Sequence, residues 1–110
     1  MDTENISKAM SDQENSGERY FEFLTKKSMS AGIFTLKTTD TDIQRPHSED
    51  EIYYAIKGKG MLTVGAEEHE IRPGAVIFVG KNITHKFHSV EEDLSLLVIF
   101  APARGTASPS

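Results

Sequence analysis

The chain has 110 residues, of which 37% are hydrophobic and 26% are charged. This length and composition are typical of one folded domain rather than of a disordered chain. Its 12 basic and 17 acidic residues give a net charge of -5, which argues against binding to a nucleic-acid backbone. No stretch approaches the roughly 18 consecutive apolar residues of a membrane span. We therefore expect neither nucleic acid nor a membrane as a partner.

Two further features narrow the functional classes. The sequence has no cysteine, which excludes disulfides, cysteine-ligated zinc, iron–sulfur clusters and a cysteine nucleophile. The opening residues MDTENISKAM are polar and acidic, without the basic start and apolar run of a secretory signal. These two features fit a cytoplasmic protein, which is the location we expect.

The first 17 residues form a segment that differs in pattern from the rest. Ile6, Ala9 and Met10 have the i, i+3, i+4 spacing of a short helical stripe, and Gly17 follows as a terminator. Two interpretations are open for residues 1–17: a frayed terminus, or a short helix laid against a sheet.

Residues 18–102 have the pattern of a domain built from short strands. Aromatic and β-branched runs alternate with turns rich in Gly, Pro and Asn. The expected strands cover residues 20–24, 31–36, 51–57, 61–64, 68–71, 75–79, 85–90 and 94–100. Many short strands with no intervening helix predict an all-β antiparallel sandwich or barrel. Residues 103–110 are small and polar, and we expect a disordered tail there.

The strand over residues 51–57 is apolar on both faces. Alternation places Ile52 and Tyr54 on one face, and Tyr53 and Ala55 on the other. Each apolar face of a sheet needs a cover, and the barrel interior can cover only one of them. The N-terminal segment, a second subunit, or both would cover the other face, and we favour a homodimer.

A set of polar residues faces the expected interior. His47 and Glu51 are four residues apart, so an extended chain places both side chains on one face together with Tyr53. A carboxylate facing an interior needs a partner, and a metal ion shared with imidazoles is one such partner. His85, at the start of a later strand, is the third candidate ligand. The alternative is a set of hydrogen-bonded histidines in a polar pocket.

The stretches PHSEDEIYYAIKGKG and PGAVIFVGKNITHKFH resemble the two motifs of the cupins, small β-barrels of the double-stranded β-helix type. In the first motif, G-x5-H-x-H-x3,4-E-x6-G, the second His, the Glu and the closing Gly correspond to His47, Glu51 and Gly58. In the second motif, G-x5-P-x-G-x2-H-x3-N, Gly74 and His85 match. The resemblance covers about residues 30 to 100. It implies an RmlC-like cupin barrel of jelly-roll type, with a divalent transition metal (Fe, Mn, Ni, Co, Cu or Zn) on His47, Glu51 and His85.

One departure from the cupin pattern concerns the metal site. Arg45 stands where the first motif has its first His, which leaves two His and one carboxylate. Such a set can hold a metal and leave positions open for substrate or oxygen. An inward Arg45 would instead repel a cation and pair with Glu51, or bind a substrate carboxylate. Gln44 is a further candidate, through its carbonyl oxygen.

Two classes of function follow for a small cupin. The first is a metal-dependent oxygenase, isomerase or lyase acting on a small organic molecule. Tyr53 and Arg45 are then the catalytic candidates, and Arg45, Tyr53, Phe87 and Gln44 are the substrate-binding candidates. The second is a non-catalytic cupin that binds or senses a small molecule without a catalytic metal. The sequence alone favours neither of these two classes of function.

Overall fold

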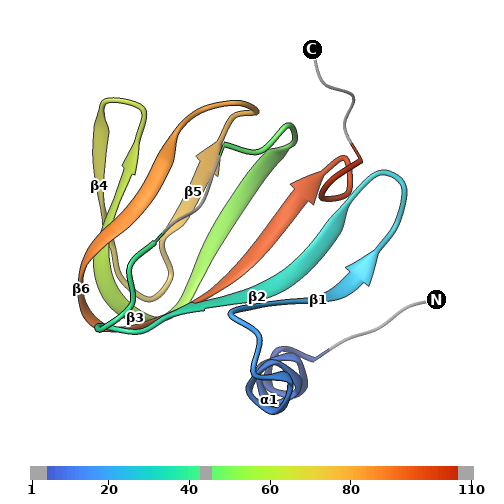
Figure 1. Cartoon of the computed structure of the whole chain (residues 1–110), viewed down its shortest axis with the longest axis horizontal. Coiled ribbons are helices and arrows are strands. Elements are labelled where there is room, and N and C mark those ends of the chain that lie inside the picture. The colour runs from blue at the N-terminus through green and yellow to red at the C-terminus, as the bar shows by residue number, and fades with distance from the viewer. Residues whose placement is uncertain (1–4, 43–45, 107–110) are drawn as a thin grey trace.

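The computed structural model describes residues 5–42 and 46–106. In these ranges one helix is followed by six strands (Figure 1). They are α1 (Ile6–Ser16), β1 (Tyr20–Thr25), β2 (Ser30–Leu36), β3 (Asp50–Val64), β4 (Glu67–Ile71), β5 (Val76–Val79) and β6 (His85–Ala101). The strands pair in the order β1-β2-β6-β3-β4, with β5 also on β3, and all pairs are antiparallel. The expected all-β antiparallel architecture is confirmed.

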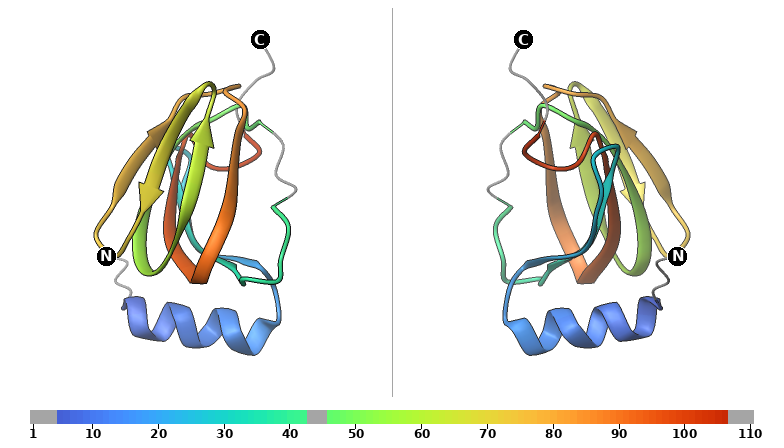
Figure 2. Two further views of the ribbon diagram at one scale, coloured as in Figure 1. Left: turned by 90° about the vertical axis from the view of Figure 1, so that its left-hand side faces the viewer. Right: turned by 90° about the vertical axis from the view of Figure 1, so that its right-hand side faces the viewer.

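The two longest strands, β3 and β6, are paired along most of their length and turn together from one layer into the other. Before the turn, β3 pairs with β5 and with the last part of β6. After register shifts between Ala55 and Met61, β3 pairs with β4 and with the first part of β6. The result is a two-layered barrel whose core lies between the layers (Figure 2).

Gly58 permits the close approach of β3 and β6 at this turn. Its φ of +102° lies in the region that favours glycine, and a Cβ atom there would overlap the carbonyl group of Asp93. Bulges of this kind bend a strand and increase its twist. The glycine therefore allows two continuous strands to serve both layers.

Burial along β3 follows the predicted alternation. Tyr53 and Ala55 are buried in the core, whereas Ile52 and Tyr54 are 39% and 43% exposed on the other face. The prediction that these residues occupy opposite faces is confirmed. The outer face of β3 is therefore apolar and open in the single chain.

The N-terminal segment contains a short helix laid against the strands. Asn5 caps α1 by accepting hydrogen bonds from the backbone N–H groups of residues 7 and 8, and Gly17 ends the helix with a φ of +72°. The buried Gln13 side chain donates to the Arg19 carbonyl and accepts from the Thr35 hydroxyl, both at 2.8 Å. The helix crosses the end of the barrel (Figure 2). In the described ranges no helix has the length and apolar character needed to cross a membrane.

The chain after β6 packs back on the barrel as a short turn. Ala103 is buried, and the backbone N–H of Arg104 donates to the Ser30 hydroxyl at 2.9 Å. The Thr106 hydroxyl donates to the Ala103 carbonyl at 2.5 Å. The sequence led us to expect a disordered tail from residue 103; residues 103–106 instead have these defined contacts, and residues 107–110 lie outside the described ranges.

The Gly58 turn gives a stability prediction. Gly58→Ala should lower the free energy of unfolding by at least about 2 kcal/mol, because an unfavourable positive φ is combined with overlap against the Asp93 backbone. Gly74→Ala is the matched control: its φ is +94°, but a Cβ there meets nothing within 4 Å. The control should lose about 1 kcal/mol in urea unfolding. Equal losses in the two variants would contradict the close approach.

Candidate metal centre

His47, Glu51 and His85 lie together between the layers of the barrel. His47 precedes β3, Glu51 is the second residue of β3, and His85 begins β6. Each side chain offers one ligand atom, and these atoms all lie within 4.8 Å of one another. The structure thus brings together three residues that are separated by up to 38 positions in the sequence (85 − 47).

Two hydrogen bonds hold residues 47–50 against the loop that leads into β6. The Asn82 N–H donates to the His47 carbonyl at 2.7 Å, and the Lys81 N–H donates to the Asp50 carboxylate at 2.9 Å. Glu51 itself is placed by the sheet, where it pairs with residues of both β5 and β6. Strand pairing and loop contacts, rather than the ligands alone, therefore set the position of the candidate site.

The His85 ring is oriented by the backbone. Its Nδ1 lies 3.0 Å from the Ile83 carbonyl oxygen, which can only accept, so Nδ1 carries the hydrogen. In the neutral ring, Nε2 is then an acceptor, and it lies 3.1 Å from Oε1 of Glu51. Both side chains are almost completely buried, with exposed fractions of 0% and 1%. Two acceptors this close need a cation between them, either a proton or a metal ion.

The buried polar atoms without a partner support this interpretation. The close approach of His85 and Glu51 does not have hydrogen-bond geometry, so Nε2 of His85 has no hydrogen-bond partner. Oε2 of Glu51 has none either. Within the described ranges, Tyr20 Oη is the third buried side-chain atom of this kind. Buried polar groups are nearly always satisfied, so these two atoms on adjacent side chains mark a place where a proton or a metal ion could be held.

The two histidines differ in how their surroundings affect protonation. Burial lowers the pKa of His47, and this effect outweighs the opposing effect of the nearby Glu51 carboxylate. Burial also acts to lower the pKa of His85, but the Glu51 carboxylate and the Ile83 carbonyl together raise it above its ordinary value. Glu51 therefore favours a positive charge on His85.

Aromatic rings surround the candidate ligands. The Tyr53 ring lies 6.0 Å from the His85 ring and 5.0 Å from the Phe87 ring, and Phe100 lies 5.0 Å from His47. Tyr53 and Phe87, both substrate-binding candidates from the sequence, are buried in the core beside the site. The other two candidates, Arg45 and Gln44, lie outside the described residues.

Two residues near the site were missed by the sequence analysis. Tyr20 packs edge-on against Phe100, with ring centroids 6.1 Å apart, and the Arg104 guanidinium lies 4.9 Å from the Tyr20 ring centre. Tyr20 belonged to an aromatic-rich strand, and Arg104 belonged to the expected tail. Neither carried a sequence signal that linked it to His47 or Glu51.

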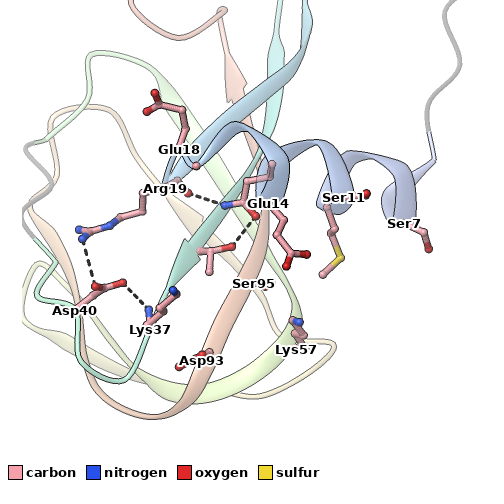
Figure 3. A pocket seen from close by; sticks show the side chains of 14 residues that line it. Ser7, Ser11, Glu14, Glu18, Arg19, Lys37, Asp40, Lys57, Asp93 and Ser95 are labelled. Atoms are coloured by element: carbon pink, nitrogen blue, oxygen red, sulfur yellow. Dashed lines mark hydrogen bonds and ion pairs between the residues drawn. The ribbon is translucent and has the colours of Figure 1, made fainter.

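A separate cleft of about 750 Å³ lies between α1 and the strand ends near it (Figure 3). None of its lining residues is a candidate metal ligand. Arg19 forms an ion pair with Asp40 at 3.5 Å, and Asp40 also accepts from the Lys37 backbone N–H (Figure 3). Because charges of both signs line the cleft and some pair with each other, it favours no particular ligand charge.

Comparison with known proteins now assigns the family. The family model described as "Cupin domain" matches residues 32–100. The chain belongs to the cupin family. This match confirms the resemblance seen in the two sequence motifs. It includes His47, Glu51 and His85, and it covers all or most of every strand except β1.

Individual cupin relatives agree with this assignment. Uncharacterized protein SCO3923 from Streptomyces coelicolor is 41% identical over 83 residues, which cover 76% of this chain and 79% of the relative. The structure of TT1209 from Thermus thermophilus has a TM-score of 0.71 at 19% identity and covers 94% of this chain and 99% of that one. An RmlC-like cupin from Shewanella frigidimarina has a TM-score of 0.70 at 16% identity, covering 78% and 77%. The two structural likenesses show a shared fold.

The electrostatics of the cupin site give a prediction for the metal-free protein. In an NMR titration, the His85 ring should titrate above the ordinary range of a histidine and the His47 ring below it, since burial dominates at His47 whereas Glu51 and the Ile83 carbonyl outweigh burial at His85. Glu51→Gln should bring the His85 pKa down, because burial is then opposed only by the Ile83 carbonyl and the Asp42 carboxylate. A His85 ring that titrates below His47 in the unchanged protein would contradict the arrangement.

Proposed function

We propose that this cupin binds a divalent transition metal ion through His47, Glu51 and His85. The observation that carries the proposal is the buried Nε2 atom of His85 facing the buried carboxylate of Glu51, with no hydrogen bond to satisfy either Nε2 or Oε2. Ligand bonds of about 2.0–2.2 Å keep two donors to one ion within about 4.4 Å of each other. The present spread of up to 4.8 Å needs only a small contraction of the side chains.

The residues around the ion suit a site for chemistry on a small organic molecule. Two imidazoles and one carboxylate leave coordination positions open, and the bound ion would supply a Lewis acid or a centre for oxygen chemistry. The Ile83 carbonyl fixes the tautomer of His85, and such supporting contacts preserve ligand orientation. The buried rings of Tyr53 and Phe100, which lie beside His85 and His47, limit the access of water to the ligands. We propose a metal-dependent oxygenase, isomerase or lyase, with Tyr53 as a catalytic candidate.

A second function has one observation in its favour. A proton on Nε2 of His85 can also account for the close approach of the ring to Glu51, because the two side chains then form an ion pair without metal. In that case the protein is a non-catalytic cupin that binds or senses a small molecule. Metal content separates the two functions.

We also propose that the functional unit is a homodimer. On the outer face of β3 and β5, Ile52 lies opposite Phe78 and Tyr54 opposite Val76. Phe78 and Val76 are 61% and 65% exposed in the single chain. A contiguous apolar sheet face of this kind is typical of an interface, and a second copy would present the same face in a two-fold arrangement.

The metal proposal is tested by elemental analysis after reconstitution with each candidate ion and dialysis. The unchanged protein should retain about one equivalent per chain of one or more ions, and His85→Ala and Glu51→Ala should lower affinity at least about tenfold. His88→Ala is the matched control, because His88 pairs with Glu68 at 2.9 Å on the partly exposed surface. Absence of retained metal with all six ions, Fe, Mn, Ni, Co, Cu and Zn, would favour the metal-free function.

The dimer proposal is tested by sedimentation at micromolar concentrations. Phe78→Lys should weaken self-association at least about tenfold, because it places a charge in the apolar face. Met29→Lys changes another exposed apolar side chain, 42% exposed, in the turn between β1 and β2, and should leave association unchanged. A monomeric unchanged protein, or equal effects of the two substitutions, would refute this interface.

A further inference from the structure

We propose that Tyr20 and Arg104 form an anion-recognition pair beside the metal centre, and that the small molecule bound there carries a carboxylate. The inference deepens the proposed function and rests on it.

The Tyr20 hydroxyl is buried and has no hydrogen-bond partner in the described part of the chain. The other two such atoms belong to Glu51 and His85, and the proposed metal ion would satisfy both. A metal ion between these two ligands does not account for the phenol oxygen. A buried hydroxyl left without a partner costs free energy, so a bound molecule is the natural source of its missing hydrogen bond.

The Tyr20 ring is held in place by contacts within the sheet. Tyr20 pairs with Phe34 across β1 and β2, and its ring lies edge-on to Phe100, which also contacts His47. Gly32 makes room for the ring, since a Cβ at that residue would lie 2.5 Å from Cζ and Oη of Tyr20. The phenol is thus held one aromatic ring away from a candidate metal ligand, and Glu51 is close enough to influence it electrostatically.

Arg104 is held against the Tyr20 ring by the turn that follows β6. Its backbone donates to the buried Ser30 hydroxyl, and the preceding Ala103 is buried. The guanidinium lies over the Tyr20 ring at 4.9 Å, where the cation is attracted by the face of the ring. In the described ranges no carboxylate lies within ion-pair distance of Arg104, so its donors are available to a ligand.

The two side chains are complementary to a carboxylate. The guanidinium supplies charge and planar N–H donors, and the hydroxyl supplies a neutral donor. Burial, followed by the nearby Glu22, raises the pKa of Tyr20, so the phenol keeps its proton and can donate it in a hydrogen bond. Arg104 stacks on Tyr20, the Tyr20 ring contacts Phe100, and Phe100 in turn contacts His47. An anion held by Arg104 would therefore lie beside the metal centre.

The test uses the cobalt(II)-loaded full chain, propionate as the probe and propionamide as its neutral analogue. Propionate should shift the visible cobalt spectrum with an affinity at least about tenfold higher than that of propionamide. Arg104→Gln should weaken propionate binding at least about tenfold, Arg104→Lys less, and Tyr20→Phe by about threefold to tenfold. Arg72→Gln is the control, because Arg72 pairs with Glu70 at an exposed strand end, and it should have no effect.

Cobalt stoichiometry distinguishes the failure of this inference from failure of the metal site. If cobalt binds fully but Arg104→Gln and Tyr20→Phe leave propionate affinity unchanged, or propionamide binds equally well, the inference is overturned. If cobalt does not bind, the same titration is followed by NMR amide shifts in the metal-free protein. Propionate binding that depends on Arg104 would then support the anion-recognition pair in the absence of metal. No such binding would overturn the inference.

Discussion

The arrangement of this cupin depends on one buried carboxylate. Glu51 is only 2% exposed because its strand has paired neighbours on both sides and the opposite layer above it. An uncompensated carboxylate in that position would be very costly, so the fold must supply a cation or a proton. His85, fixed by the Ile83 carbonyl, faces Glu51 with the one nitrogen that can accept either. The neighbouring rings of Tyr53 and Phe100 reduce the access of water, which raises the cost of leaving the Glu51 charge uncompensated.

The same architecture separates the molecule into two ends with different roles. The loops before β3 and β6 meet at one end, where His47 lies in the first loop and His85 begins β6, and hydrogen bonds between the two segments keep them in place. The helix α1 covers the other end (Figures 1 and 2). Its buried Gln13 joins it to the strands through hydrogen bonds in addition to apolar contact. The proposed ligand chemistry is therefore confined to the end where the aromatic rings lie beside His47 and His85.

Much of the fold and part of the site could be predicted from the sequence, because their signals are local. Period-two alternation gave the faces of β3, and the even spacing of His47 and Glu51 placed both on the interior side. The positions of Tyr20 and Arg104 depend on contacts between distant segments: a hairpin with Gly32 and a turn bonded to Ser30. No periodicity encodes such contacts. Arg45, the departure from the cupin motif, lies outside the described residues and keeps its sequence-based interpretation.

The continuity of β3 and β6 has a consequence for cooperativity. Because both strands pass through both layers, neither layer can separate from the other without breaking strand pairs that hold the remaining layer. Small domains with this degree of coupling unfold in a single transition rather than one half at a time. Glu51 lies in the first part of β3 and His85 in the first part of β6, one in each layer. The geometry of the candidate site therefore depends on the global stability of the barrel. Local fluctuation alone does not separate Glu51 from His85.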